Sequence, residues 1–304
     1  MTHEAVPADP TSMDELACLI SGLSVSEGVN PTPWRGLIVV RANRPIARHQ
    51  VVYKPCLCIV AQGRKLAYLG DRVVTYDPEN FLVVSLQLPI EAEIVEATFE
   101  RPFLALVLEI DPAMVSQLIL DMEEADPASD TIRRHQPAMT TSTTDEPFIQ
   151  SVIRFFRTLE DPVDRRILGP AAVREIFYRV LLSEQGGSLG MLAHRDSNTH
   201  RVSRVQRFLE ENYAERLDIS TIAHSSGMSE STLHHTFKAV TSLSPIQYLK
   251  KVRLHQARLM MAHTGLSAGE AAFRVGYQSA SQFSREFKRL FGVSPSRAAD
   301  SLLG

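Results

Sequence analysis

The sequence has few cysteines and no apolar run long enough to cross a membrane. Its three cysteines are an odd number, which argues against a disulfide framework and favours a reducing compartment. Uninterrupted apolar runs such as Leu37–Val40 have the length of a strand, far below the ~20 residues that span a bilayer. The N-terminus is acidic and contains prolines, unlike a signal peptide. We therefore expect a cytoplasmic protein without a membrane segment.

The chain changes character along its length and predicts an α+β multidomain protein. Residues 1–33 predict an N-terminal arm, with a short helix around Asp14–Leu23 as an option. Residues 34–112 hold strand-length apolar runs separated by turn residues, which is typical of an antiparallel sandwich or barrel. Residues 113–185 carry helical apolar spacing. A linker rich in Gly, Ser and Asn is predicted over 186–200, followed by a domain over 201–304.

The formal charge is distributed unevenly between these parts. The whole chain carries a net charge of −3, but residues 201–304 contain 14 Lys and Arg against 8 Asp and Glu, a charge of +6. The first 200 residues therefore carry −9. This asymmetry indicates one basic domain that faces a polyanion and one domain that does not.

The C-terminal domain contains an internal repeat. Phe237-Lys238 recurs as Phe287-Lys288, and Ser244-Pro245 recurs as Ser294-Pro295, each 50 residues later. Such a period indicates one supersecondary unit built twice. The two units, about 218–240 and 267–290, each read as a short helix, a turn glycine (Gly227 or Gly276), a capping serine (Ser229 or Ser279) and a second helix. This order is that of a helix-turn-helix.

The second helix of each unit has one apolar and one polar face. Leu233, Phe237 and Val240 form the first apolar seam, and Phe283, Phe287 and Leu290 the second. The opposite faces carry side chains of the kinds that contact base edges and phosphates, namely Ser231, His234, His235 and Lys238, and Ser281, Ser284, Arg285 and Lys288. Double-stranded DNA is therefore the expected partner. The unlike faces predict unlike half-sites and an asymmetric operator.

A long helix over about 245–262 should connect the two units. Its ~18 residues span about 27 Å, close to the ~34 Å between successive major grooves on one face of a duplex. Apolar positions along it supply surface for both units to dock on, namely Tyr248, Leu249, Val252, Leu254, Ala257 and Leu259.

Two stretches of this sequence resemble one known family. SSGMSESTLHHTFKAVTSLSPIQYLKKVRLHQARLMM and EAAFRVGYQSASQFSREFKRLFGVSPS resemble the DNA-binding domain of AraC/XylS-type regulators. The block that begins PCLCIVAQGRKLAYLG resembles the cupin-like β-barrel at the N-terminus of one AraC subgroup. The resemblance implies that the positions Ala280, Gln282, Thr232 and Ser279 also belong to the DNA-binding set. Relatives commonly carry larger Trp, Gln or Arg side chains where this chain has Ser231 and two histidines.

The resemblance also implies how the protein works. It implies a transcription regulator, an activator rather than a repressor, that contacts RNA polymerase and responds to an unknown small-molecule effector in the barrel. It implies a homodimer formed by the helices of 113–185, for which the sequence offers the apolar residues Phe155, Phe156, Ile176, Phe177 and Leu181 as a seam. Coupling between effector and DNA is expected through the linker.

An enzyme is the rival interpretation, because many cupins are metal enzymes. A metal cupin needs several strand histidines, but His49 is the only histidine between Trp34 and Ile110. The G-x-G-x-x-G and Walker motifs of nucleotide sites are missing too. We expect no enzyme activity, no metal and no cofactor. Two alternatives remain: a cupin enzyme fused to a DNA-binding domain, and a ligand-free regulator whose barrel is purely architectural.

Cys56 and Cys58 lie on one face of a predicted strand and leave two interpretations open. They are either two buried small hydrophobes or an electrophile or redox sensor. A reactive thiolate needs a nearby cation, and Lys54, Arg64 and Lys65 are close in sequence.

Overall fold

The computed structural model describes residues 8–125, 137–183, 186–190 and 198–300. Contacts divide the chain into two units: most of the first precedes residue 201, and the second consists of residues 201–304 together with His49–Val51. The first unit contains the β-sheets together with helices, and the second is built from helices. The predicted α+β class, with a β-sheet N-terminal part and a helical C-terminal part, is confirmed.

The first unit contains a six-stranded sheet, in the order β1-β2-β9-β4-β7-β10, and a four-stranded sheet, in the order β3-β8-β5-β6. The strands are β1 (Gly28–Pro31), β2 (Leu37–Ala42), β3 (Ile46–Tyr53), β4 (Cys56–Gln62), β5 (Arg64–Leu69), β6 (Arg72–Tyr76), β7 (Asn80–Val84), β8 (Leu88–Glu96), β9 (Phe103–Glu109) and β10 (Met139–Thr143). Gly63 makes the tight turn from β4 to β5 with a φ of 86°, and a Cβ there would lie 2.4 Å from the Glu96 carbonyl oxygen. Only glycine fits this turn.

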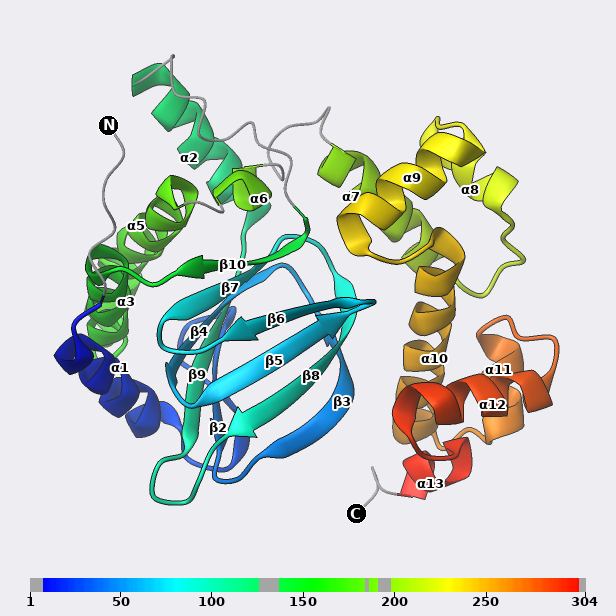
Figure 1. Cartoon of the computed structure of the whole chain (residues 1–304), viewed down its shortest axis with the longest axis horizontal. Coiled ribbons are helices and arrows are strands. Elements are labelled where there is room, and N and C mark those ends of the chain that lie inside the picture. The colour runs from blue at the N-terminus through cyan, green and yellow to red at the C-terminus, as the bar shows by residue number, and fades with distance from the viewer. Residues whose placement is uncertain (1–7, 126–136, 184–185, 191–197, 301–304) are drawn as a thin grey trace. The chain divides into compact units, whose positions relative to one another are not determined.

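Helices cover the outer face of the six-stranded sheet. They are α1 (Pro10–Leu23), α2 (Pro112–Ala125), α3 (Glu146–Thr158), α4 (Pro162–Ile167), α5 (Gly169–Leu182) and α6 (Gly186–Gly190). Buried residues of α1, α3 and α5 share one apolar cluster with Leu57 and Ile59 of β4 (Figure 1). Because successive strand residues point to opposite faces, Cys56 and Cys58 face the other way, into the space between the two sheets. We call this space the lumen.

The structure differs from the expected N-terminal arm. The Asp9 side chain caps α1 by accepting from the Thr11 backbone N–H, and Pro10 occupies the first helical position. Leu16 and Ile20 are fully buried in the apolar cluster of the sheet, and β1 extends that sheet next to β2. The prediction of an arm is therefore wrong for the described residues of 1–33, whereas the helix offered around Asp14–Leu23 is present and begins earlier, at Pro10.

The predicted dimer seam is also wrong for the residues that were named. Phe155, Phe156, Ile176, Phe177 and Leu181 are each at most 1% exposed, because they pack within their own chain. Their apolar spacing reflects the internal core.

Two further boundaries differ from expectation. β10 lies inside the segment 113–185 that was predicted to be helical, and it pairs with β7. The first five residues of the predicted linker form α6, in which Leu189 is fully buried. Residues 191–197 of that linker lie outside the described residues.

The second unit is built around one long helix. Its elements are α7 (Asn198–Glu211), α8 (Ile219–Ser226), α9 (Glu230–Thr241), α10 (Pro245–Thr264), α11 (Ala268–Arg274), α12 (Ala280–Phe291) and α13 (Pro295–Asp300). Ser244 and Gln247 form a capping box that fixes the start of α10, and its 20 residues span about 30 Å. Five of the six predicted docking residues of α10 are buried, but Leu259 is 52% exposed and Met261 is buried instead.

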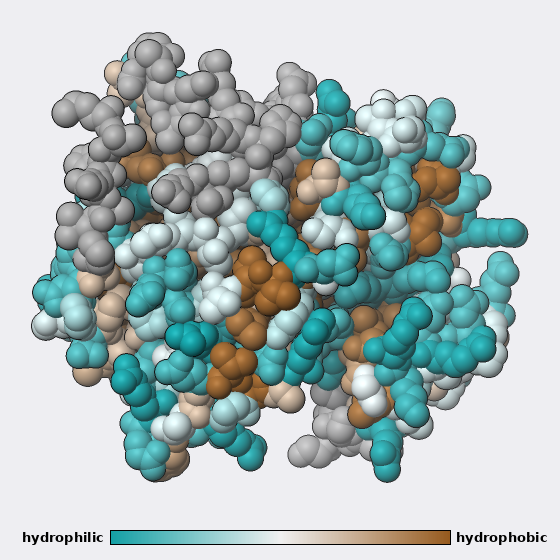
Figure 2. All heavy atoms as spheres, in the orientation of Figure 1, coloured by the Kyte–Doolittle hydropathy of each residue, from teal (hydrophilic) through white to brown (hydrophobic). Residues whose placement is uncertain are grey.

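Hydrophilic residues cover most of the face drawn in Figure 2, and brown apolar groups occupy separate small areas. None of the helices in the described residues has the length and hydropathy needed to cross a bilayer.

Candidate DNA-binding surface

The first helix-turn-helix consists of α8 and α9. Gly227 ends α8 in the left-handed conformation, with a φ of 68°, and lets the chain reverse within a short turn. The Ser229 side chain then accepts from the Thr232 backbone N–H and caps α9. Both features confirm the predicted glycine and serine.

The polar face of α9 is exposed, as the sequence predicts. Leu233, Phe237 and Val240 are buried, whereas Ser231, Thr232, His234, His235 and Lys238 are exposed. The Thr232 hydroxyl lies 2.8 Å from the Ser229 hydroxyl, so Thr232 is part of the cap. The remaining four side chains are accessible to a ligand of this helix.

The second helix-turn-helix consists of α11 and α12. Gly276 has a φ of 88°, and a Cβ there would lie 2.5 Å from the carbonyl oxygen of Ala214. A glycine is therefore needed both for the turn and for the close approach of the segment before α8. Ser279 caps α12 by accepting from the Gln282 backbone N–H, 3.3 Å away.

Helix α12 is also divided into two faces. Phe283 and Phe287 are fully buried. Of the predicted residues, Ser281, Gln282, Arg285 and Lys288 are exposed, while Ser279, Ala280 and Ser284 are half-buried. The Ser281 hydroxyl lies 2.9 Å from the Ser279 hydroxyl, so both take part in the start of the helix.

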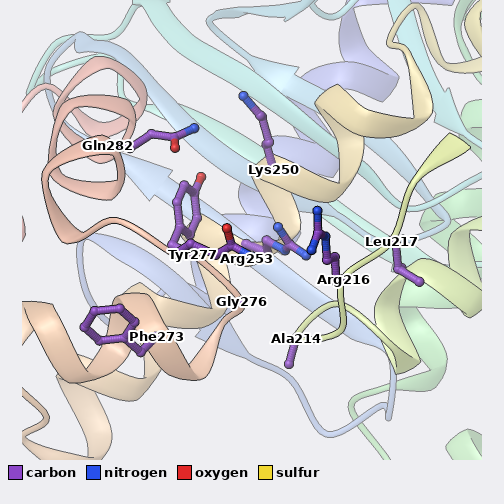
Figure 3. A pocket seen from close by; sticks show the side chains of 10 residues that line it. Ala214, Arg216, Leu217, Lys250, Arg253, Phe273, Gly276, Tyr277 and Gln282 are labelled. Carbon is purple, nitrogen blue, oxygen red and sulfur yellow. The ribbon is translucent and has the colours of Figure 1, made fainter.

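A carboxylate that sequence reasoning missed, Glu286, joins α12 to α10. It accepts hydrogen bonds from Lys250 Nζ at 2.9 Å, Tyr277 Oη at 2.8 Å and Gln282 Nε2 at 3.1 Å. Figure 3 shows the three donor side chains. Burial would raise the pKa of Glu286, but these three hydrogen bonds outweigh it and hold the pKa below its usual range. The group is therefore ionised at neutral pH.

The same contact orients a predicted DNA-binding side chain. A carboxylate only accepts hydrogen bonds, so the amide NH2 of Gln282 is the group that points toward Glu286. The amide oxygen of Gln282 is then turned away from Glu286. This orientation offers an acceptor on the exposed side of α12.

A pocket of about 450 Å³ adjoins this network (Figure 3). Side chains from α10, the α11–α12 turn and the segment before α8 line it, including the cations Arg216, Lys250 and Arg253. Arg253 donates to the backbone carbonyl oxygens of Tyr213 and Glu215, each at 2.7 Å, and so ties that segment to α10. The second unit, which is basic, therefore has a pocket lined by cationic side chains next to Gln282.

In the first unit, the predicted sensor residues lie in a polar cluster inside the lumen. Cys56 and Cys58 are buried, and their sulfurs are 3.7 Å apart. Of the three candidate cations, Lys65 interacts with both thiols. The hydrogen bond to Cys58 and then burial raise the pKa of Cys56 well above its usual value, so the thiol keeps its proton at neutral pH.

Among the described residues, no group of three or more His, Cys, Asp and Glu side chains is placed to bind a metal ion. Residues 186–190 spell G-x-S-x-G, a nucleophile pattern that sequence reasoning missed. Ser188 is buried in α6, its hydroxyl is 3.3 Å from that of Thr140, and α6 follows a helix, so the strand-turn-helix setting of that nucleophile does not occur here.

Comparison with protein families assigns both units. The model of the AraC-type transcriptional regulator N-terminus matches residues 33–188, more than half of the chain. The chain belongs to the AraC-type transcriptional regulators. A helix-turn-helix domain model matches residues 222–301 of this AraC-type regulator. Proteins of this family bind DNA and are not enzymes, which removes the alternative of a fused cupin enzyme.

Relatives of this AraC-type regulator include the HTH-type transcriptional activator RhaS. The RhaS of Escherichia coli O1:K1 is 30% identical over 148 residues, which are 48% of this chain and 52% of the relative. The RhaS of Escherichia fergusonii is 33% identical over 153 residues, or 50% of this chain and 54% of the relative. The chain thus spans about half the length of these curated relatives.

Solved structures of ToxT from Vibrio cholerae share the fold of this AraC-type regulator. One, the P21 crystal form, is 11% identical, covers 88% of this chain and 98% of ToxT, and has a TM-score of 0.59. Another, bound to (E)-4-(8-methylnaphthalen-1-yl)but-3-enoic acid, covers 87% of this chain and 97% of ToxT at a TM-score of 0.56 and 11% identity. At this identity the likeness concerns the fold alone.

Proposed function

We propose that this regulator activates transcription by binding an asymmetric operator with α9 and α12 in successive major grooves. The observation that carries the proposal is that one 20-residue helix, α10, joins two capped helix-turn-helix units, each with an exposed polar face. Its length of about 30 Å is close to the ~34 Å between successive major grooves. Activation is supported by the RhaS relatives, which are transcriptional activators.

The proposed roles of the DNA-binding residues follow from where they lie. Ser231, His234 and His235 of α9 read bases in one groove, and Ser281, Gln282, Ser284 and Arg285 of α12 read bases in the next. Lys238 and Lys288 contact phosphates. Thr232, Ser279 and Ala280 lie at the helix starts, where backbone N–H groups meet a phosphate.

The first unit is proposed to sense a small-molecule effector in its lumen and to pass the signal to the DNA-binding unit and RNA polymerase. The ToxT structure with a bound small molecule supports this use of the fold. We place the limits of the sensor unit near residues 8 and 190, and the start of the DNA-binding unit near 198. A cytoplasmic location is part of the same proposal.

A homodimer remains part of the proposal, with a different seam from the one first expected. Among the exposed apolar residues of the helical segment, which also include Leu120 and Leu168, two pairs have i,i+4 spacing: Val163 and Ile167 on α4, and Tyr178 and Leu182 on α5. Analytical ultracentrifugation of the chain and of Ile167→Glu tests this. A dimer that persists unchanged in Ile167→Glu contradicts this seam.

A redox response of Cys56 and Cys58 is a second candidate, favoured by their sulfur separation of 3.7 Å. The raised pKa of Cys56 opposes it, because the thiolate is the reactive form. A double Cys56→Ser, Cys58→Ser variant that loses its response to diamide would support the redox candidate. An unchanged response would eliminate it.

Footprinting on the DNA upstream of the protein's own gene tests the main proposal. We expect protection of two adjacent major grooves, and loss of protection in one groove for Arg285→Ala. Arg166→Ala is the matched control, because it removes an exposed arginine from α4 of the first unit. Absence of specific protection by the wild-type chain on any selected sequence would contradict the proposal.

A further inference from the structure

The pocket beside Gln282 has the size of a small-molecule site (Figure 3). Its volume is about 450 Å³, and sites for small molecules have volumes of roughly 300–1,000 Å³. All the residues that line it lie between 214 and 282, within the second unit. Gly276 keeps part of this space open, because a Cβ there would lie 3.1 Å from Arg253 Nη2.

Two guanidinium groups line the pocket without a carboxylate partner. Arg253 Nη2 donates to the Glu215 carbonyl oxygen at 2.7 Å, which brings its guanidinium against the backbone next to Arg216. Asp218, two residues after Arg216, caps α8 by accepting from the Thr221 backbone N–H. Within the part of the chain that the structure describes, neither arginine forms an ion pair. Both charges are therefore available to a ligand.

The charge of the pocket fits a ligand with two negative charges. The third cation, Lys250, is already neutralised by Glu286, which accepts from it at 2.9 Å. Burial lowers the pKa of Arg253, so its surroundings disfavour the positive charge that arginine keeps at neutral pH. An anion beside the two guanidinium groups would remove this unfavourable interaction.

The geometry of guanidinium favours a phosphate as that anion. Its planar fork presents N–H donors that match two phosphate oxygens at once. Arg253 uses only Nε and Nη2 for backbone carbonyls, which leaves Nη1 for a ligand. Arg216 is exposed, and its side chain forms no hydrogen bond to the other described residues, so it can turn toward the same phosphate.

An aromatic ring forms another wall of the pocket. Phe273 of α11 lines it and is 62% exposed, which leaves a ring face open to a ligand. Figure 3 shows the Phe273 ring and the Arg216 side chain on either side of Gly276. Flat aromatic groups, nucleic-acid bases among them, stack favourably on such rings. A ligand that reaches both walls would therefore carry an aromatic ring at one end and a phosphate at the other.

We propose that this pocket binds a free nucleotide, whose phosphate pairs with Arg216 and Arg253 and whose base stacks on Phe273. Duplex DNA shares the phosphate chemistry, but its bases are paired and stacked and are not available to Phe273. This inference goes beyond the proposed function, because it assigns a second ligand site within the DNA-binding unit.

Calorimetry of the full chain without DNA at pH 7 tests this assignment. The probes are AMP, GMP, CMP and UMP, each compared with its nucleoside and with inorganic phosphate. We expect at least one nucleotide to bind more tightly than both comparison probes. Its affinity should fall about tenfold or more in Arg216→Met and about fivefold or more in Phe273→Ala. Arg274→Met, which removes an exposed arginine of α11 that does not line the pocket, is the matched control and should bind like the wild type.

Each outcome either supports or overturns the nucleotide site. No binding of any of the four nucleotides, equal binding of a nucleotide and its nucleoside, or equal losses in Arg216→Met and Arg274→Met overturns it. Arg216 and Phe273 are exposed, so both variants should fold, and their thermal midpoints should match that of the wild type.

Duplex DNA measured with the same samples separates the two sources of phosphate. If the wild type binds no nucleotide and Arg216→Met weakens the binding of every duplex sequence equally, Arg216 contacts the DNA backbone and the nucleotide site is wrong. Specific DNA binding without nucleotide binding overturns only this inference. Nucleotide binding without specific DNA binding overturns only the proposed function.

Discussion

The two helix-turn-helix units have the same order of helices and turns. They differ in the side-chain contacts that fix the second helix of each, α9 and α12, which we call the reading helices. Each starts its reading helix at a capping serine and buries a phenylalanine, Phe237 or Phe287, against the centre of the unit. Glu286 of α12 accepts from Lys250 of α10. Within residues 198–300 that the structure describes, no side chain of α9 forms a hydrogen bond or ion pair to α10.

This difference teaches that one fold can combine a preorganised and an adaptable reading helix. The Gln282 side chain is already hydrogen-bonded to Glu286 in the absence of DNA. The second helix-turn-helix therefore loses less side-chain conformational freedom when it binds DNA. His234 and His235 of the first helix-turn-helix are exposed, and their side chains can change conformation to fit the groove. We expect the second helix-turn-helix to discriminate more strongly between DNA sequences than the first.

The largest expected effect is a loss of folding stability, and it should be equal for the two helix-turn-helix units. Phe237→Ala and Phe287→Ala each leave a cavity at a fully buried position and should lower the free energy of unfolding of the second unit by about 3–5 kcal/mol. Urea denaturation measures this. A loss below about 1 kcal/mol in either variant would show that the corresponding unit is not packed as described.

Acid should weaken the second helix-turn-helix first. His255 of α10 packs edge-on to Phe291 of α12 at a centroid distance of 5.2 Å, and burial, followed by Lys251 and Arg258, lowers the pKa of His255 to about 4. The neutral form is favoured in the folded state, so its stabilising contribution is complete above pH ~6.5 and is lost as pH falls toward 4.

We expect His255→Leu to remove on the order of 2–3 kcal/mol of this acid sensitivity. Thermal unfolding between pH 7 and pH 4 is the measurement. His263→Leu, at an exposed position in the last turn of the same helix, is the control and should behave like the wild type. An identical acid limb in wild type and His255→Leu would contradict the role of His255.

Removal of the Glu286 carboxylate should leave α12 without its hydrogen bond to α10, so that the second helix-turn-helix resembles the first in this respect. Glu286→Ala leaves Lys250, Tyr277 and Gln282 without their acceptor and should cost about 1–2 kcal/mol of stability and about tenfold in DNA affinity. Glu230→Ala removes an exposed carboxylate from the first turn of α9 and should change stability by less than about 0.5 kcal/mol. If Glu286→Ala and Glu230→Ala change stability and DNA affinity equally, the proposed difference between the two helix-turn-helix units is wrong.

The smallest effect concerns the two lysines at equivalent positions of the repeat. Lys238→Ala and Lys288→Ala should each reduce the slope of log K against log salt by about one, without a change in sequence preference. Fluorescence anisotropy at several salt concentrations measures the slope, with Arg166→Ala as the control. A changed base preference in either variant would move that lysine from phosphate contact to base reading.

Features with local signals could be predicted from the sequence. The turn glycines, the capping serines and the apolar seams of α9 and α12 depend on residues within one or two helical turns. The N-terminal helix was offered only as an option from Asp14, although Asp9-Pro10, a cap followed by proline at the first helical position, signals its true start. Strand β3 has no such local signal, because Arg48, His49 and Gln50 interrupt its apolar pattern.

Features that depend on tertiary contacts could not be predicted. Glu286 meets Lys250 across 36 residues and Lys65 meets Tyr53 across two strands, so neither cluster is visible along the chain. The apolar spacing of Phe155 and Phe177 is the same whether a helix packs on its own sheet or on a second copy, and the wrong choice produced the wrong dimer seam. Periodicity identifies an apolar face but does not identify what covers it.

Selection of binding sites from random duplex DNA tests most directly the claim that α9 and α12 read two unlike half-sites. The wild-type chain should select two different half-sites about 10 base pairs apart, and His234→Ala with His235→Ala should lose preference in one half-site only. Gln282→Ala with Arg285→Ala should lose preference only in the other, by about 1–3 kcal/mol per contacted base. Selection of one half-site, or loss of preference at the same bases in both double variants, would contradict the account.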